Sequence, residues 1–181
     1  MKIICLVGMP GSGKSLVRRI IRRNFKVHTI ASGDIVRKEL RKRKEELTPK
    51  TDIKIGEWFH KKGRESLIAE RTWQRIKRHK NNLVVIDGFR SPNDVRYLTK
   101  FSGVKPTIIA ITAPFEIRAK REIKRKRMKG KESVSYIKAR DKSELKRGLG
   151  TLIRNADYTV DNSRLSKKQL ENRIIALVKK I

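Results

Sequence analysis

Residues 3–15 read IICLVGMPGSGKS, and this stretch decides the fold class of the chain. Residues 3–7 are apolar and run directly into glycines, a pattern typical of a buried strand that enters a turn. Apolar residues at 16, 17, 20 and 21 then follow the spacing of one helical face. The order strand, glycine-rich loop, helix predicts an α/β fold.

The loop matches the pattern G-x-x-x-x-G-K-[ST] in full. Its members are Gly8, Met9, Pro10, Gly11, Ser12, Gly13, Lys14 and Ser15. Glycines let successive backbone N–H groups point at phosphate oxygens, and the following helix adds its positive N-terminal end. Lys14 supplies a mobile charge for the β and γ phosphates, and Ser15 offers a hydroxyl to Mg²⁺. We therefore expect ATP-type nucleotide binding with Mg²⁺.

A second apolar run, LVVID at residues 83–87, ends in an acidic residue followed by Gly88. A carboxylate at a strand end beside such a loop serves the metal ion, directly or through water. Asp87 is thus the predicted metal partner of Ser15. The alternative is that Asp87 only caps the following turn.

Further segments alternate between strand-like and helix-like patterns. We expect strands at 27–31, 106–112 and 158–160, and helices at 34–46, 94–101, from 114 onward and from 166, with two more inside 51–80 divided near Gly63. Asp34 is expected to cap its helix or to support its loop, and residues 133–149 are charged and less periodic. Alternation of this kind predicts a parallel sheet of about five strands with helices on both faces.

Four passages make the chain resemble the nucleoside monophosphate kinases, adenylate kinase most of all, and among them archaeal adenylate-kinase-related proteins. These passages are IASGDIVR at 30–37, DGFR at 87–90, Ala113-Pro114 followed by Arg121 and Arg125, and ADYTVDN at 156–162. The resemblance implies a three-layer P-loop kinase fold over residues 1–181. It also implies an inserted acceptor lobe at about 33–80 and a short lid at about 126–147.

The resemblance also implies roles for individual residues. Lys14, Arg90 and Arg121 would be catalytic, Arg125 would lie against the donor base, and the acceptor would contact Ser32, Gly33, Arg37, Gly88, Phe89 and Arg90. Arg140, Arg147 and Arg154 would add phosphate contacts from the lid. The chain departs from adenylate kinases after DGFR, because SPND at 91–94 offers no glutamine to read the acceptor adenine.

These roles imply transfer of the γ-phosphoryl group of Mg-ATP to a nucleoside monophosphate or similar acceptor, with AMP as the first candidate. Two alternatives stay open at this point. One is an adenylate-kinase-like ATPase that acts on RNA or ribosomes, and the other is an enzyme like dephospho-CoA kinase.

The charge keeps the RNA alternative open. The chain has 181 residues with 48 Lys and Arg against 18 Asp and Glu, a formal net charge of +30. Basic clusters at 37–44, 61–80, 118–131 and 138–147 are expected around the mouth of the cleft, to attract a charged substrate or RNA. Arg18, Arg19, Arg22 and Arg23 are interpreted as solvated surface groups, and no histidine receives a role.

The composition and the apolar runs indicate where in the cell the protein is expected. A single cysteine excludes an internal disulfide, and no apolar run approaches the ~20 residues of a membrane span. The opening apolar run is too short for a signal peptide. We therefore expect a cytoplasmic protein with nucleotide substrates, no membrane partner and no readable oligomeric state.

Overall fold

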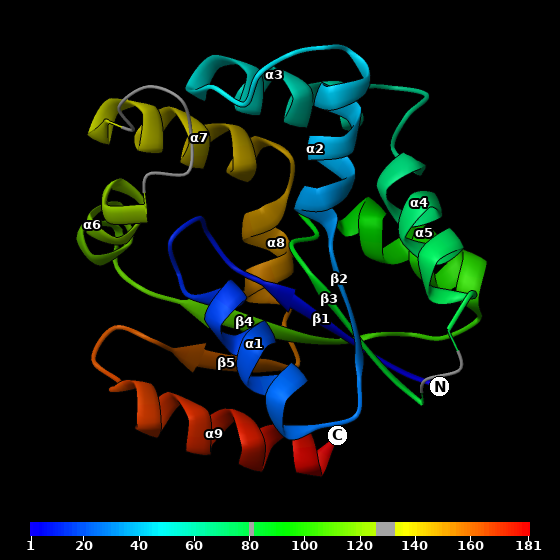
Figure 1. Cartoon of the computed structure of the whole chain (residues 1–181), viewed down its shortest axis with the longest axis vertical. Helices are drawn as coiled ribbons and strands as arrows, with labels where there is room; N and C mark the ends of the chain where they lie inside the picture. Colours follow the sequence, from blue (N-terminus) through cyan, green and yellow to red (C-terminus); the bar gives the residue numbers. More distant parts are fainter. Residues whose placement is uncertain (80–81, 126–132) are drawn as a thin grey trace.

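A computed structural model describes residues 1–79, 82–125 and 133–181 (Figure 1). Its described residues form a five-stranded sheet in the order β2-β3-β1-β4-β5, and every pairing is parallel. The strands are β1 (Lys2–Val7), β2 (His28–Ala31), β3 (Leu83–Asp87), β4 (Thr107–Thr112) and β5 (Tyr158–Asp161). The predicted α/β class and the five-stranded parallel sheet are confirmed.

The strand register brings the candidate site residues to one edge of the sheet. Leu6 of β1 and Ala31 of β2 both lie opposite Asp87 of β3. Parallel strands bring their carboxyl ends to the same edge, and ligands of open α/β sheets bind beyond that edge. The glycine-rich loop after β1 and the acid that ends β3 are therefore neighbours.

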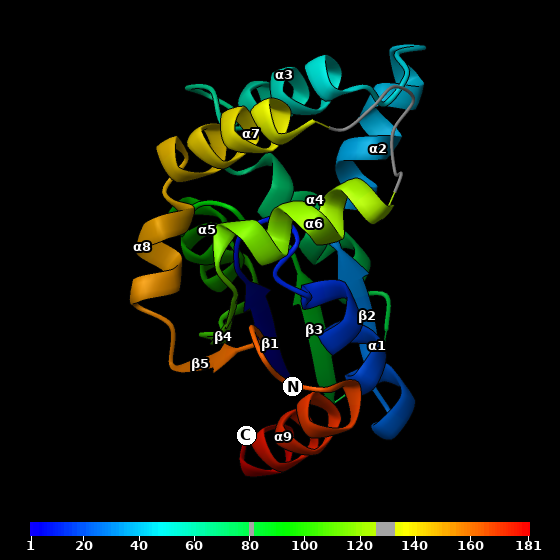
Figure 2. The ribbon, with the colours of Figure 1, turned by 90° about the vertical axis from the view of Figure 1, so that its left-hand side faces the viewer.

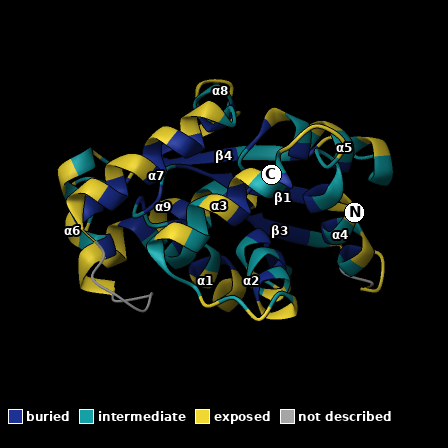
Figure 3. Ribbon diagram, turned by 90° about the horizontal axis from the view of Figure 1, so that it is seen from above, coloured by how far each residue is buried: buried dark blue, intermediate teal, exposed yellow. Residues whose placement is uncertain are grey.

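Helices cover both faces of the sheet, each with its own apolar core. α1 (Lys14–Asn24) and α9 (Lys167–Lys180) pack on one face against Ile4, Leu6 and Val85. Side chains of the other face, among them Ile3 and Cys5, pack with α5 (Pro92–Ser102) and the helices inserted after β2. Because side chains alternate along a strand, β1 contributes to both cores. Figure 3 shows the strands buried between helices whose outer surfaces are exposed.

The described residues between β2 and β3 form three helices: α2 (Ser32–Lys42), α3 (Pro49–Phe59) and α4 (Leu67–Ile76). The two helices expected around Gly63 are therefore present, and α3 begins earlier than expected because Thr48 forms a capping box with Thr51. The prediction that Asp34 caps α2 is wrong. The N-cap is Ala31, and Asp34 lies in the first turn, where it pairs with Arg37.

The segment from 114 to 154 folds as α6 (Phe115–Arg125), α7 (Val134–Lys146) and α8 (Leu149–Arg154). Residues 126–132, the first part of the expected lid and the end of the expected basic helix, lie outside the described residues. Figure 2 shows α3, α6 and α7 above the carboxyl edge of the sheet. This arrangement encloses the space beyond the glycine-rich loop.

The start of α9 was predicted correctly, because Ser166 forms its capping box with Gln169. In the described part of the chain, no helix combines the length and the apolar character that a membrane crossing requires.

Candidate active site

The loop after β1 has a backbone that favours glycine. Gly8, Gly11 and Gly13 have φ angles of 146°, 77° and 107°. A Cβ at Gly8 would lie 2.2 Å from the carbonyl oxygen of Ile111, and one at Gly13 would lie 2.3 Å from Nδ2 of Asn162. Side chains at these positions would therefore push the loop away from the strands that support it. The loop ends where α1 begins, so the helix N-terminus faces the phosphate site.

Lys14 folds over this loop. Its Nζ donates hydrogen bonds to the carbonyl oxygens of Gly8 at 2.6 Å and Met9 at 2.9 Å. Burial, together with the nearby Arg90 guanidinium, lowers the pKa of Lys14 to about 7. The ammonium group is thus held in place by neutral carbonyls, while the charges of Asp87 and Glu144 only partly offset the effect of burial on its pKa.

Asn162, at the end of β5, clamps the loop from behind. Its buried Nδ2 donates to the backbone carbonyl oxygen of Ser12 at 2.9 Å. The backbone carbonyl oxygen of Asn162 accepts from Arg121 Nη2 at 2.9 Å. Arg118 holds the loop from another side through the carbonyl oxygen of Pro10 at 3.0 Å. No role could be predicted for Asn162 or Arg118 from the sequence, since both act on the backbone of a distant segment.

Asp87 lies at the end of β3, buried beside the loop. Its Oδ2 is 3.6 Å from Nε of Arg18. The interpretation of Arg18 as a solvated group is therefore wrong, and Arg19 also lines the cleft. Arg18 lies in the first turns of α1, beside the end of β3, whereas Arg19 is exposed at the edge of the cleft.

The hydroxyl of Ser15 and the carboxylate of Asp87 line the same cleft. Oxygen donors of this kind suit Mg²⁺, which usually binds through one or two protein oxygens together with substrate phosphates. No group of three or more His, Cys, Asp or Glu residues that could hold a metal occurs within residues 1–79, 82–125 and 133–181. The donor set therefore fits a metal that arrives with a nucleotide.

The cleft beyond the sheet has a volume of about 680 Å³. Most of the sequence-predicted site residues line it: Pro10, Gly11, Gly13, Lys14, Ser15, Gly33, Arg37, Asp87, Gly88, Arg90, Arg121, Arg125 and Arg140. Gly8, Met9 and Ser12 complete the loop from behind, where Met9 packs against the apolar cluster around Leu149.

Ser32 and Arg147 line only the smaller pocket beside the cleft, and Phe89 and Arg154 line neither space. The Phe89 side chain is fully buried in the core, so it can support the acceptor side only by packing. Arg154 lies exposed on α8, where it contacts Thr151. The expectation that every basic cluster surrounds the cleft is also wrong, because Lys38, Lys42, Arg75 and Arg78 line a separate groove.

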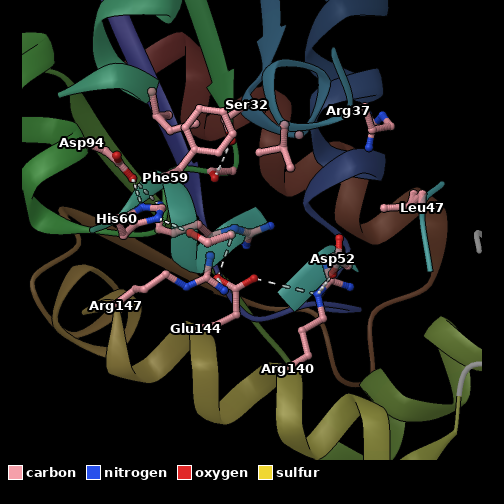
Figure 4. Close-up of a pocket in the computed structure, with 16 residues that line it drawn as sticks. Ser32, Arg37, Leu47, Asp52, Phe59, His60, Asp94, Arg140, Glu144 and Arg147 are labelled. Atoms are coloured by element: carbon pink, nitrogen blue, oxygen red, sulfur yellow. Dashed lines mark hydrogen bonds and ion pairs between the residues drawn. The ribbon is translucent and has the colours of Figure 1, made fainter. Parts of the chain in front are cut away.

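A smaller pocket of about 70 Å³ continues the cleft under α3 and α7 (Figure 4). The two spaces share Gly33, Arg37, Gly88, Arg90 and Arg140. One wall of the small pocket is apolar, and its side chains come from Val36, Leu47, Phe59 and Ile68. Ser32 does more than line the pocket, since its hydroxyl donates to the carbonyl oxygen of Gly88 at 2.5 Å and holds α2 to the end of β3.

The arginines of this pocket lie among carboxylates that sequence analysis missed. Oε2 of Glu144 is 3.3 Å from Arg90 Nε and 3.5 Å from Arg147 Nη2. Burial by itself would raise the pKa of Glu144, but Arg90, Arg147 and Arg140 together lower it to about 2. Glu144 is therefore charged at neutral pH, at the centre of the arginines expected to hold the acceptor.

Arg140 joins three helices. Its Nε is 2.9 Å from Oδ2 of Asp52 on α3, and its Nη1 donates to Oε2 of Glu122 on α6 at 3.1 Å. Arg140 itself belongs to α7 and is buried. The expected lid residue is thus a structural link above the pocket as well as a lining cation.

His60 and Asp94 form the inner end of the pocket (Figure 4). Nε2 of His60 lies 3.6 Å from Oδ2 of Asp94, which also accepts backbone N–H bonds from Arg90 and Ser91 at 2.8 and 3.0 Å. Asp94 thereby fixes the backbone that carries the Arg90 side chain. The serine and aspartate at 91 and 94 have capping-box spacing, a signal from which this role could have been predicted.

Taken together, the parallel sheet, the phosphate loop and the cleft define a P-loop protein of kinase-like architecture. The chain belongs to the UPF0200 family, and residues 7–141 match the AAA domain family. It is 35% identical to the UPF0200 protein of Thermococcus onnurineus (strain NA1) over 99% of this chain and 97% of that protein. It is 36% identical to the UPF0200 protein of Methanococcus vannielii over 100% of this chain and 97% of that protein.

Solved structures of kinases share the fold. A shikimate kinase from Acinetobacter baumannii in complex with shikimate superimposes with a TM-score of 0.63 and 18% identity, covering 99% of this chain and 94% of that one. A gluconokinase from Sinorhizobium meliloti 1021 superimposes with a TM-score of 0.63 and 14% identity, covering 99% and 92%. At such identities the likeness concerns the fold alone.

Proposed function

We propose that this protein is an ATP-dependent phosphotransferase, which moves the γ-phosphoryl group of Mg-ATP to an anionic acceptor bound in the pocket under α3 and α7. A nucleoside monophosphate is the proposed acceptor class, with AMP as the first compound to test. One observation carries the proposal. The phosphate-loop cleft and the arginine-lined pocket are continuous and share Arg37, Arg90 and Arg140, so a donor and an acceptor can meet between them.

On the donor side, the loop N–H groups and the start of α1 bind the phosphates. Lys14 exchanges its carbonyl contacts for phosphate oxygens, and Arg121 covers the group in transfer from α6. Ser15 and Asp87 would hold Mg²⁺, and the metal would neutralise charge on the phosphates.

On the acceptor side, Arg37 and Arg90 bind the anionic group at the boundary of the two spaces. Planar guanidinium groups suit this task because each can bind two oxygens of one phosphate. The apolar wall of Val36, Leu47 and Phe59 receives the remainder of the acceptor. We propose accordingly that residues 33–80 act as the acceptor lobe.

Phosphoryl transfer to an acceptor phosphate needs alignment and charge compensation more than a catalytic base. α7 supplies both, since it brings Arg140 and Arg147 to the acceptor while it covers the pocket. We propose that residues 133–147 act as the described part of the lid and exclude water from the transferred group.

The proposal is tested by measuring ADP formation from Mg-ATP with AMP, CMP, UMP, GMP, dephospho-CoA, shikimate or gluconate. The last two are included because a shikimate kinase and a gluconokinase share the fold. We expect one monophosphate to accelerate ADP formation and to become phosphorylated itself. Turnover that no acceptor accelerates, but that RNA stimulates, would contradict the proposal and favour the ATPase alternative.

Variants separate the two sides of the site. Lys14→Ala should abolish ATP-dependent activity, whereas Arg90→Ala should raise the acceptor KM much more than the ATP KM. Arg154→Ala is the matched control, because Arg154 is an exposed arginine that does not line the cleft. Equal loss of ATP binding in Lys14→Ala and Arg90→Ala would contradict the roles proposed here.

A further inference from the structure

A second cationic site lies between α2 and α4, outside the proposed active site. The groove there has a volume of about 250 Å³ and shares no lining residue with the cleft or the acceptor pocket. Its lining consists of Ile35, Lys38, Glu39, Lys42, Arg71, Gln74, Arg75 and Arg78. Five of these eight side chains are cationic and one is acidic, so the groove is suited to an anion.

Cations of the groove form two rows. Lys38 and Lys42 are one helical turn apart on α2, and Arg71 and Arg75 are one turn apart on α4. Residues four apart on a helix are neighbours on its surface, about 6 Å apart along the axis. Because α2 packs against α4, the rows flank one channel. Like charges at this spacing oppose helix formation unless an anion lies between them.

The groove has more positive charge than its one lining carboxylate, Glu39, can compensate. Glu39 is bound by Arg43 at 3.1 Å and by Arg71 at 3.0 Å. In the portion of the chain that the structure describes, Lys38, Lys42, Arg75 and Arg78 have no carboxylate within ion-pair distance. The acceptor pocket differs sharply, since Arg90, Arg140 and Arg147 each lie against a carboxylate there.

From this arrangement we propose that the groove between α2 and α4 binds the phosphate backbone of single-stranded RNA. Two rows of cations match a chain of phosphates better than a single phosphate, which would need convergent, buried donors. Of these cations, Arg71 pairs with Glu39, and the others have no carboxylate partner among the described residues. Apart from Ile35, the lining is charged or polar and contains no aromatic residue on which a base could stack. Recognition is therefore electrostatic and independent of sequence. The formal charge of +30 brings such a polyanion to the surface.

Salt dependence measures the number of phosphate contacts. For single strands, the slope of log K against log salt concentration is about −0.7 per contact. The experiment measures fluorescence anisotropy of a labelled RNA of about 20 nucleotides, longer than the ~4–16 nucleotides of a typical single-strand site. It compares the wild type with the fourfold variant Lys38→Gln, Lys42→Gln, Arg75→Gln and Arg78→Gln at salt concentrations between about 50 and 200 mM.

The matched control carries Lys168→Gln, Arg173→Gln, Lys179→Gln and Lys180→Gln on the exposed surface of α9. It loses the same four charges on the opposite face of the sheet. Titration of both variants with ATP and their thermal unfolding establish that the cleft and the fold are intact.

We expect the groove variant to bind RNA more weakly and to lose up to about 3 units of slope, which corresponds to four lost contacts. The control should keep its slope within one unit. The proposal is overturned if wild-type protein does not bind RNA, if both variants lose the same affinity, or if the groove variant binds like the wild type. Displacement of RNA by inorganic phosphate at constant ionic strength would also overturn it, since the site would then recognise a single phosphate.

Discussion

At the residue scale, the protonation of Lys14 should make nucleotide binding at the phosphate loop depend on pH. Burial and Arg90 lower the pKa of its ammonium group to about 7, and phosphate oxygens would raise it again by placing negative charge beside it. At a pH above that pKa, Lys14 is mostly uncharged in the free protein. In the complex with Mg-ATP, Lys14 is charged. Binding of Mg-ATP should therefore take up a proton, and the affinity should fall as pH rises above about 7.

This proton uptake is measured by titration calorimetry about one pH unit above the pKa of Lys14, in buffers with different ionisation enthalpies. We expect the wild type to take up nearly one proton when Mg-ATP binds. The Lys14→Gln variant should lack the proton uptake that Lys14 provides. Identical proton uptake in the two proteins would show that Lys14 does not change its protonation on binding.

Asn162 offers a second test at this scale. Its side chain donates to the carbonyl oxygen of Ser12 from a buried position, so Asn162→Ala leaves that carbonyl without its partner. We expect a loss of about 1–3 kcal/mol in unfolding free energy, together with weaker ATP binding. Asn172→Ala, at an exposed position of α9, is the control and should change neither. An unchanged ATP affinity in Asn162→Ala would show that the loop does not depend on this clamp.

At the scale of the elements, the phosphate loop and the apolar strands were predictable, and α7 was not. Residues 3–15 carry their signal locally, because glycines and a lysine at fixed spacing need no distant partner to be recognised. α7 buries Arg140, Asp141 and Glu144 where an ordinary helix buries apolar residues. Hydrophobic periodicity is therefore hidden in this segment, and the sequence shows only a charged stretch.

The carboxylates of the site were missed because no local pattern in the sequence marks them. Arginines can be assigned from a resemblance, but their carboxylate partners come from other elements: Asp52 from α3, Glu122 from α6 and Glu144 from α7. Such pairs lie far apart in sequence and follow no spacing rule. His60 follows α3 and Asp94 lies in the first turn of α5, yet their side chains meet at 3.6 Å.

Arg140 should be the residue that holds these helices together. Arg140→Ala leaves Asp52 and Glu122 without their buried cation, and breaking such a network costs about 3–5 kcal/mol. We expect a fall of that size in the free energy of unfolding, measured with denaturant. Arg154→Ala, also a helical arginine but exposed, should stay within about 0.5 kcal/mol of the wild type. Similar stability of both variants would contradict the linking role of Arg140.

Glu144 gives the network a pH dependence. Its pKa in the folded protein, about 2, is below the ordinary value of 4.5, so its contribution to stability is present above pH 4.5. That contribution should be lost as pH falls from 4.5 toward 2, since protonation then favours the unfolded chain. Glu144→Gln should therefore be less stable at neutral pH and lose less stability on acidification. Parallel stability curves for the two proteins would refute the assignment.

At the scale of the whole molecule, the charge is divided unequally. Five of the 18 acidic residues pair with arginines in or beside the cleft, namely Asp52, Asp87, Glu122, Asp141 and Glu144, whereas four cations of the groove between α2 and α4 have no such partner among the described residues. The parallel sheet could be predicted from alternating segments, because β1, β3 and β4 are mostly apolar runs. Which charges are paired and which are not could not be predicted from the sequence, since this depends on how α2 to α4 fold over the sheet. The nucleoside monophosphate kinase resemblance stays a prediction about the acceptor.

The central claim is that one continuous cleft aligns ATP with an acceptor and excludes water. It is tested most directly by following the γ-phosphoryl group of labelled Mg-ATP with AMP present, and then with the other acceptors of the panel. We predict that label passes to one acceptor faster than it is released as inorganic phosphate, and that Arg90→Ala abolishes the preference. Release of all label as inorganic phosphate with every acceptor, at the same rate as without one, would contradict the claim.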